Sequence, residues 1–471
     1  MSSLAAVCML LALVPSPLFA ATNVPSIDPQ ATYRKPVIYA TWIMIWIGAT
    51  EKWWRPQDYE GCRVKYPEGL SAKESIDWND PVLRKFYLEQ IRDAGIDVIV
   101  IDFTNGFRWE KAARDVQKFC YENNMKMCIA FNPQGGSSME SACGMVWKTF
   151  ADPGVHYSEA YFQKDGKPLC VIYTWRSGYA ASVAQSGPER GRFSTVWASG
   201  EDGADNKWGW QLEPWELAHP SADSVFVNSA VKWNSPRGTA ETWRKSLAVF
   251  DYNMLIARRS RPKHVIIGSY DDMHERNSWI KIDTAGADRG AQMRDIQGKV
   301  SADTYYDRVK SWIRGNAPVF VKGGIIKDGA YRMVNVSTGL GFSSVTPTAH
   351  NSEDLGAPLL QRAADHRYLG ATECYYWFYH LGDNEFRIVH LSSALSLADE
   401  SGTIKQVWDD VLPNQSWKIE GAGGNYLLVN KATGKALGVR SDKPGTEIVT
   451  RVKNRDDTLQ QWALNPVAIL E

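Results

Sequence analysis

Between residues 35 and 315, short apolar runs alternate with amphipathic segments, and this alternation constrains the fold more than any other feature of the sequence. Apolar runs bounded by turn residues are typical of buried strands. Segments with apolar residues every three or four positions are typical of helices that cover a sheet. Their alternation predicts a parallel α/β fold. The predicted strands are residues 37–46, 97–103, 127–131, 168–175, 193–197, 224–227 and 265–270, with 318–322 as a candidate eighth.

The size of this region favours a closed barrel. Seven or eight strand–helix units over roughly 290 residues match a (β/α)8 TIM barrel. An open doubly wound sheet is the structural alternative, but no glycine-rich phosphate loop follows the first predicted strand. We therefore predict a (β/α)8 domain over residues 30–322. Asp80 and Pro81 should begin its first helix and Gly95 should end it.

A burst of ionisable residues follows the strand predicted at 265–270. Asp271, Asp272, His274 and Glu275 occur within five residues. In β/α barrels the carboxyl ends of the strands carry the active site. Two close carboxyl groups push their pKa values apart, so that one donates a proton and the other accepts one or stabilises charge, as glycoside cleavage requires. A solvated acidic turn is the alternative, and the position at a barrel strand end favours the catalytic interpretation.

The run SYDDMHE at residues 269–275 resembles the end of the penultimate barrel strand in glycoside hydrolase family 99 and its family 71 neighbours, where the pattern is Asn-Glu-Trp-His-Glu. Residues 79–97 also resemble the first helix and second strand of that group. The resemblance implies a retaining glycoside hydrolase. Asp272 would match the first carboxylate, which assists the sugar 2-hydroxyl as an internal nucleophile, and Glu275 the general acid/base. This chain has Asp272 where the family has Glu, and Met273 where it has Trp.

Other residues near predicted strand ends are candidates for the same cleft. Asp102 follows an apolar run and is either a charged subsite residue or a buried structural acid. The chain has 20 Trp and 20 Tyr, and flat aromatic faces suit both sugar rings and a large core. The candidate substrate-binding residues are Asp102, Trp46, Asn132, Trp175, Glu201, Tyr270, Asp271 and His274.

From about residue 325 onward, helical periodicity disappears and short segments repeat. Three segments align and each precedes a tryptophan: residues 331–339 before Trp377, 386–394 before Trp417, and 426–434 before Trp462. Gln415 and Gln460 stand two residues before the second and third tryptophan, and Tyr375 takes that place in the first repeat. A threefold repeat predicts a closed all-β body. Residues 325–471 resemble the ricin-B-type β-trefoil lectins, which implies a carbohydrate-binding domain; the Gln-x-Trp signature itself argues for the fold and not for sugar binding.

The N-terminal residues predict export. Residues 1–21 have the apolar run and small-residue cleavage site of a signal peptide, so we expect a secreted or periplasmic protein in which disulfides are permitted. No later segment is long and apolar enough to span a membrane. The 53 basic and 53 acidic residues include no basic block, which argues against a nucleic-acid partner. No Cys/His spacing suggests zinc, and we predict no metal or cofactor.

These features together predict a secreted glycoside hydrolase that cleaves a poly- or oligosaccharide, helped by a lectin-like module that raises the local substrate concentration. A catalytically silent glycan-binding protein is one alternative, because Asp272 departs from the family pattern. A polysaccharide lyase on the same barrel is another, and Tyr270, His274 or Lys281 would be candidates for its base.

Overall fold

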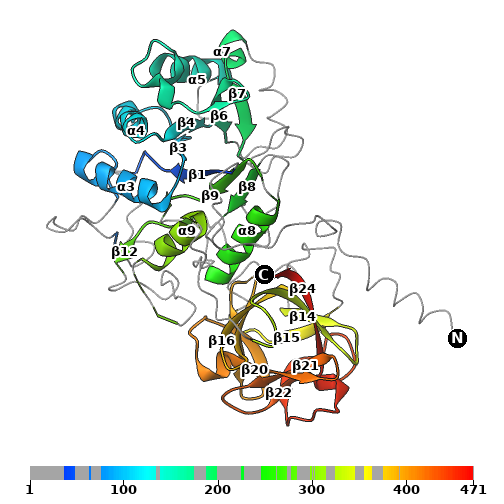
Figure 1. Cartoon of the computed structure of the whole chain (residues 1–471). Helices are drawn as coiled ribbons and strands as arrows, with labels where there is room; N and C mark the ends of the chain where they lie inside the picture. The colour runs from blue at the N-terminus through cyan, green and yellow to red at the C-terminus, as the bar shows by residue number, and fades with distance from the viewer. Residues whose placement is uncertain are drawn as a thin grey trace.

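The computed structural model contains an α/β part and an all-β part, which are the upper and lower bodies in Figure 1. The predicted signal peptide (1–21) and the candidate eighth strand (318–322) lie outside the residues that the structure describes. The described residues are 37–47, 63–64, 76–133, 138–173, 187–198, 224–227, 246–260, 262–272, 277–283, 298–299, 301, 303–314, 324–344, 355–362, 375–391 and 393–469.

Parallel strands form the centre of the α/β part. They are β1 (Ile38–Ile43), β3 (Val98–Phe103), β4 (Lys126–Phe131), β6 (Lys167–Ile172), β7 (Ser194–Trp197), β8 (Ser224–Val227) and β9 (His264–Ile267). Their order in the sheet is β7-β6-β4-β3-β1-β9-β8, and a short β5 (Gln163–Lys164) is antiparallel to β6. Strand β1 pairs with both β3 and β9. The first strand therefore lies between the second and the seventh, and all seven carboxyl ends point the same way.

Helices lie between these strands and around them, with α3 and α4 on the left of Figure 1 and α8 and α9 below. They are α3 (Pro81–Ala94), α4 (Glu110–Glu122), α5 (Met139–Val146), α7 (Pro188–Gly191), α8 (Leu247–Ser260) and α9 (Thr304–Arg314). The predicted start of α3 at Asp80 and Pro81 and its predicted end at Gly95 are confirmed. The Asp80 side chain accepts hydrogen bonds from the backbone N–H groups of Val82 and Leu83, and Gly95 ends the helix with φ of 98°.

The all-β part contains three repeats of four strands. The first repeat has β13 (Gly329–Asn335), β14 (Gly341–Ser344), β15 (Leu359–Arg362) and β16 (Tyr375–Gly382). The second repeat has β17 (Glu385–His390), β18 (Ser396–Glu400), β19 (Thr403–Val407) and β20 (Ser416–Ala422). The third repeat has β21 (Asn425–Asn430), β22 (Ala436–Val439), β23 (Ile448–Arg451) and β24 (Trp462–Ile469). Because β13 pairs with β24, the first repeat meets the last. The threefold repeat is therefore confirmed.

The glutamines of the Gln-x-Trp signature have a structural role. Gln415 donates to the carbonyl of Trp408 (2.7 Å) and accepts from the backbone N–H groups of Asp410 and Leu412. Gln460 donates to the carbonyl of Val452 and accepts from the N–H of Asn454, both at 3.0 Å. Each glutamine thus closes the loop before the last strand of its repeat, as expected of a signature that marks the fold.

The alignment of the first repeat was wrong by one residue. Trp417 and Trp462 are buried and donate to the carbonyls of Leu397 (3.1 Å) and Leu437 (3.0 Å). Their equivalent is Tyr376, whose hydroxyl donates to the carbonyl of Phe342 (2.7 Å), and not Trp377. Tyr376 pairs with Tyr331 and His390, just as Trp462 pairs with Tyr426 and Asn335.

The continuous aromatic run at residues 375–379 explains this error. A strand with one buried face alternates apolar and polar residues, but both faces of β16 are buried here, so no alternation reveals the register. Tyr376 and Phe378 enter the core of the all-β part. Trp377 and Tyr379 point the other way, into the core that surrounds the parallel strands. The outer face of β16 is therefore the surface that joins the two parts.

Buried charges lie at this junction. Asp251 on α8 accepts from Arg308 Nε (2.7 Å) and, at close range, from a second nitrogen of the same guanidinium group on α9. It also accepts from Trp312 Nε1 and from the hydroxyl of Tyr379, each at 2.6 Å. Tyr379 comes from β16, so this one carboxylate is bonded to both parts of the chain.

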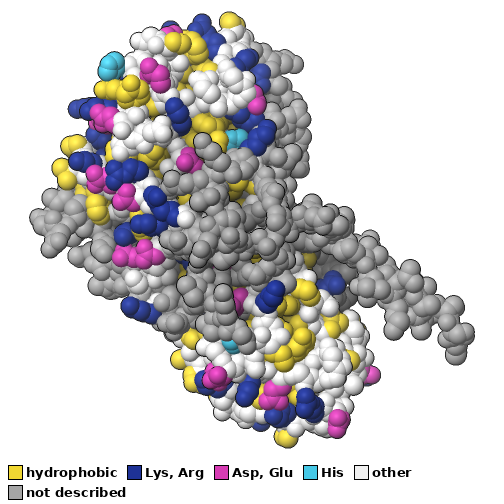
Figure 2. Space-filling model, in the orientation of Figure 1, with side chains coloured by type: hydrophobic (Ala, Val, Ile, Leu, Met, Phe, Trp, Pro, Cys, Tyr) yellow, Lys and Arg dark blue, Asp and Glu magenta, His cyan; other side chains and the backbone are white. Residues whose placement is uncertain are grey.

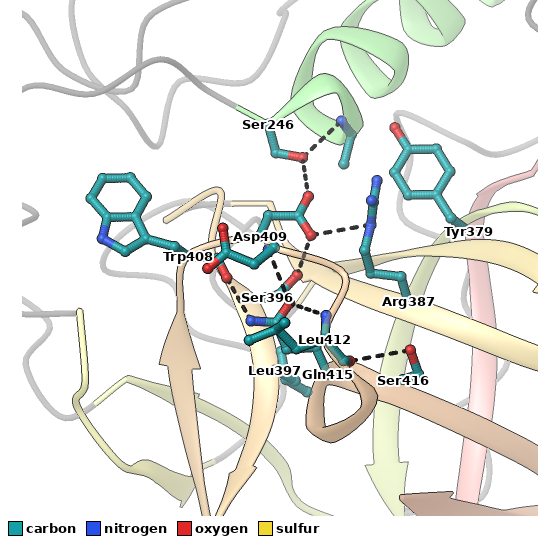
Figure 3. A network of polar contacts seen from close by, with 12 residues as sticks. Ser246, Tyr379, Arg387, Ser396, Leu397, Trp408, Asp409, Leu412, Gln415 and Ser416 are labelled. Atoms are coloured by element: carbon teal, nitrogen blue, oxygen red, sulfur yellow. Dashed lines mark hydrogen bonds and ion pairs between the residues drawn. The ribbon is translucent and has the colours of Figure 1, made fainter. Parts of the chain in front are cut away.

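A second ionic contact, between buried Arg387 and half-buried Asp409, lies close by, and Figure 3 shows it. Asp409 accepts from Ser396 (2.7 Å) and from Ser246 beside the start of α8 (3.3 Å). It is also paired with Arg387 Nε at 3.2 Å, and the guanidinium of Arg387 lies 4.7 Å from the centre of the Tyr379 ring. The bond from Ser246 joins the all-β part to the residue beside α8, and Ser396 and Arg387 hold Asp409 in place for that bond.

Candidate functional site

The predicted acidic run lies beyond the end of β9. Its first two residues form β10 (Asp271–Asp272), which is antiparallel to β11 (Asn277–Ser278). Asp271 and Asp272 are both fully buried. The alternative of a solvated acidic turn therefore does not hold for these two residues. His274 and Glu275 lie outside the described residues, as do Trp175 and Glu201.

Asp271 is held by donors from two other segments. Its carboxylate oxygens accept from the backbone N–H of Met44 at 3.0 and 3.2 Å, and Oδ2 accepts from Trp78 Nε1 at 2.6 Å. Burial raises the pKa of Asp271 to about 7, although these hydrogen bonds lower it. The neighbouring charges of Asp272 and Asp102 raise it further. The structure therefore places three acidic side chains near enough for the charges of Asp272 and Asp102 to affect Asp271, and burial brings the pKa of Asp271 close to neutral.

Tyr270 occupies the strand exit between β9 and β10. Its backbone N–H donates to the carbonyl of Trp42 (2.7 Å), and its ring packs edge-on against Trp279, with centroids 4.8 Å apart. Trp78 and Tyr87 also contact this ring. Tyr270 is fully buried, and burial raises the pKa of its hydroxyl well above the ordinary value. Tyr270 is therefore in contact with protein aromatic rings on several sides.

Asp102 lies near the end of β3 and is only 4 % exposed. It accepts from Trp42 Nε1 (3.0 Å) and from the backbone N–H of Thr104 (2.6 Å). Burial raises its pKa, and the bonds from Thr104 and Trp42 lower it. Trp46 and Asn132, just beyond β1 and β4, are also buried. The described candidate residues thus all follow the carboxyl ends of neighbouring parallel strands, or lie near them.

Sequence reasoning missed Trp78 and the backbone N–H of Met44. They are 193 and 227 residues from Asp271 in the chain, and no local pattern connects them with it. Asp251 was also missed, because an acid in the middle of an amphipathic helix is ordinarily read as a surface residue. A buried indole or backbone donor gives no sequence signal of its own.

Several expectations concern metals, membranes and disulfides. Within the described part of the chain, no group of three or more His, Cys, Asp or Glu residues could hold a metal ion. No described helix is long and apolar enough to cross a membrane. Four cysteines of the described residues are buried and unpaired: Cys120, Cys128, Cys143 and Cys170. Burial raises the pKa of the thiols of Cys120, Cys128 and Cys170.

The charge distribution agrees with the zero net charge of the sequence. On the face shown in Figure 2, basic and acidic side chains of the described residues are intermixed over both parts of the chain. An extended positive surface, which nucleic-acid binding requires, is not seen among the described residues of that face.

Comparison with known proteins identifies the all-β part. The family described as ricin-type beta-trefoil lectin domain-like matches residues 373–451 and 413–468. The C-terminal part of this chain is a ricin-type β-trefoil lectin-like domain. The trefoil, as we call it from here on, comprises strands β13 to β24. No curated protein matches the chain.

Solved structures are similar over about a third of the chain. The designed threefold-symmetric protein ThreeFoil is 26 % identical and the match covers 30 % of this chain and 100 % of ThreeFoil, with a TM-score of 0.26. The exo-β-1,3-galactanase 1,3Gal43A of Clostridium thermocellum is 21 % identical, covering 36 % and 34 %, with a TM-score of 0.27. The hemolytic lectin CEL-III is 19 % identical, covering 32 % of each chain, with a TM-score of 0.25. This chain thus spans about a third of the galactanase and of CEL-III.

Proposed function

We propose that this protein is an exported glycoside hydrolase that acts on a poly- or oligosaccharide. The observation that carries the proposal is the buried acidic pair Asp271 and Asp272 beyond the end of β9, in electrostatic contact with Asp102. Acids that are buried close together are typical of sites for general acid/base catalysis, because burial and neighbouring charges shift carboxyl pKa values there. Asp272 and Glu275 are the proposed catalytic carboxyl groups.

The strand order supports a (β/α)8-like barrel as the scaffold. In the described sheet the first strand pairs with both the second and the seventh, and the sixth lies beside the seventh. A sheet that winds in one direction and returns to its first strand has this order. In such a barrel the carboxyl ends of all strands surround one cleft, and the acids of β3 and β10 would share it.

The proposed reaction follows the resemblance to glycoside hydrolase families 99 and 71. Asp272 would polarise the sugar 2-hydroxyl for internal attack on the anomeric carbon, and Glu275 would protonate the departing glycosidic oxygen. Glu275 would then activate water for the second step, so that the anomeric configuration is retained. Burial favours this chemistry, because charge interactions are stronger where water is excluded.

The trefoil would bind glycan and hold it near the cleft. Two hydrogen bonds join the trefoil to α8 and to the residue beside its start, from Tyr379 to Asp251 and from Ser246 to Asp409, so a bound glycan would be presented in a defined position rather than on a loose tether. Confinement of substrate near the active site raises its effective concentration without new contacts at the cleft. This role supports poly- or oligosaccharides as the substrate class.

A non-catalytic glycan-binding protein is the second candidate, and the lectin-like trefoil is the observation that favours it. A lyase is less well supported. Tyr270 is buried with a raised pKa, which disfavours the phenolate that a base would need. Lys281 is paired with Asp303 (3.5 Å) and its ammonium group lies over the Tyr306 ring.

The test is product release from a broad glycan panel by the mature full-length protein. Glu275→Gln and Asp272→Asn are assayed beside Glu122→Gln, an exposed helix residue that serves as the matched control. We expect the wild type and the control to cleave one glycan with retention of configuration and both site variants to lose at least about a hundredfold in rate. A glycan that is retained on the protein but never cleaved would instead establish the binding protein.

A further inference from the structure

We infer that Asp271 is a positioning residue: its carboxylate ties β10 to the end of β1 and to Trp78, and thereby fixes the place of Asp272. The inference rests on the proposed function for its catalytic consequence, because Asp272 is one of the two proposed catalytic groups. The anchoring itself is a structural statement that a substrate-independent measurement can test.

The pairing of β10 with β11 is too short to fix Asp272 by itself. Among the described residues, two pairs join these strands, Asp271 with Ser278 and Asp272 with Asn277. Isolated two-stranded pairs are marginal in water even when they are longer. The side chain of Asp271 supplies what this ladder lacks, because it bonds to two segments that are remote in sequence.

The two donors are themselves held in place. The backbone N–H of Met44 lies directly beyond β1, the strand in the middle of the sheet order. The Trp78 ring packs edge-on against Tyr87 of α3, with centroids 5.3 Å apart, and its backbone N–H donates to the carbonyl of Ile47 (3.2 Å). A group held by rigid elements transmits its position to what it binds.

The hydrogen-bond pattern explains why the residue is an acid. Both oxygens of Asp271 accept from the backbone N–H of Met44, and Oδ2 also accepts from the Trp78 indole. An amide would offer one acceptor and put a donor where the second donor already points. Asp271→Asn should therefore lose one of the two attachments while nearly preserving the side chain's volume.

The two oxygens of Asp271 are directed at protein donors, the backbone N–H of Met44 and the Trp78 indole. Asp272 is the next residue on the strand, and successive side chains of a strand point to opposite faces. Asp271 therefore anchors one face of β10 and leaves the other face to Asp272. Misplacement of a catalytic group by about 1 Å is enough to lower a rate by roughly a hundredfold.

The first test is amide hydrogen exchange over residues 268–280 in the full-length mature protein. Trp78→Phe and Asp271→Asn are compared with Trp312→Phe, which removes an indole bond of the same 2.6 Å length to a different buried carboxylate, Asp251. We expect exchange in this segment to rise at least about tenfold in the first two variants and to stay within about threefold of wild type in the control. Unchanged exchange in both Trp78→Phe and Asp271→Asn would overturn the inference.

The second test is steady-state kinetics on the glycan that the panel identifies. For Trp78→Phe we expect kcat to fall about ten- to a hundredfold with little change in KM, because the variant retains every proposed catalytic group. Faster exchange with an unchanged kcat would contradict a catalytic role for the anchoring. Faster exchange in a protein that cleaves no glycan would leave the anchoring intact and overturn the proposed function. Trp78→Phe keeps the test decisive if Asp271→Asn does not fold.

Discussion

Removal of one hydroxyl group at the domain junction should destabilise both parts of the protein. The hydroxyl of Tyr379 on β16 donates to the buried carboxylate of Asp251 on α8 at 2.6 Å. Hydrogen bonds to charged groups contribute about 1.5–3 kcal/mol, and Asp251 would keep its bonds from Arg308 and Trp312. We therefore expect Tyr379→Phe to lower the free energy of unfolding by about 2 kcal/mol without preventing folding.

The matched control is Tyr331→Phe, which also removes a tyrosine hydroxyl from the trefoil. That hydroxyl donates to the backbone carbonyl of Lys327 (2.8 Å), a neutral acceptor on an exposed residue, so water can replace it. We expect this loss to be at most about 1 kcal/mol and confined to the trefoil.

The assay is denaturant-dependent hydrogen exchange read on peptides from α8 and from β16. A shared core and a shared carboxylate imply that Tyr379→Phe lowers protection in both peptides by the same amount. Loss of protection in β16 alone, with α8 unchanged, would refute the argument that the junction couples the two parts.

Three further predictions follow from single buried groups. Because the pKa of Asp271 is raised from 3.8 to about 7, the folded state holds a proton that the unfolded chain releases. The free energy of unfolding should therefore fall as pH rises from about 4 to 7, by up to about 4 kcal/mol for this residue. Urea unfolding measured at several pH values in that range should show a weaker dependence of this free energy on pH for Asp271→Asn than for the wild type. Gly95→Ala should destabilise by about 1–2 kcal/mol in thermal unfolding, because φ is 98° there and a Cβ would lie 2.9 Å from Ile313 Cγ2. Four buried thiols, those of Cys120, Cys128, Cys143 and Cys170, should react with a thiol reagent only after denaturation. Reaction of any of these four in the native protein would contradict their burial.

The parallel strands could be predicted because strands buried on both faces form continuous apolar runs. Their ends could not be predicted as well. The run predicted as a strand at residues 37–46 continues past Ile43, where β1 ends, because Met44, Ile45 and Trp46 are buried although they are not in the strand. Apolar residues report burial, and only hydrogen bonding decides where a strand stops.

The trefoil repeats could be predicted wherever a polar side chain marked the register. Gln415 and Gln460 have a fixed task in closing a loop, so their spacing to the following tryptophan placed the second and third repeats correctly. In the first repeat no glutamine precedes the core aromatic residue, and five consecutive aromatic residues offered several registers. The choice of Tyr376 over Trp377 depends on a partner surface that is far away in sequence.

The candidate site shows the same limit. The sequence placed Asp102, Asp271 and Asp272 near the carboxyl ends of strands, and their burial agrees with a shared environment. It did not distinguish an acid that anchors from an acid that reacts, because that difference is made by the donors around each carboxylate. For Asp271 those donors are separated from it by about two hundred residues.

The abundance of tryptophan acquires a physical explanation from these contacts. Indole N–H groups donate to three buried carboxylates: Trp42 to Asp102, Trp78 to Asp271, and Trp312 to Asp251. An indole brings one strong donor on a large apolar surface, so it satisfies a buried acid without bringing in water or a compensating charge. Burial raises the pKa of Asp102 and of Asp271, and the indole bonds lower these pKa values only in part, because a neutral donor offsets desolvation less than a cation would. Trp42 and Trp78 therefore act on the proposed chemistry from inside the core, by keeping two acids of the candidate site dry and fixed, rather than as exposed surfaces on which a sugar would stack.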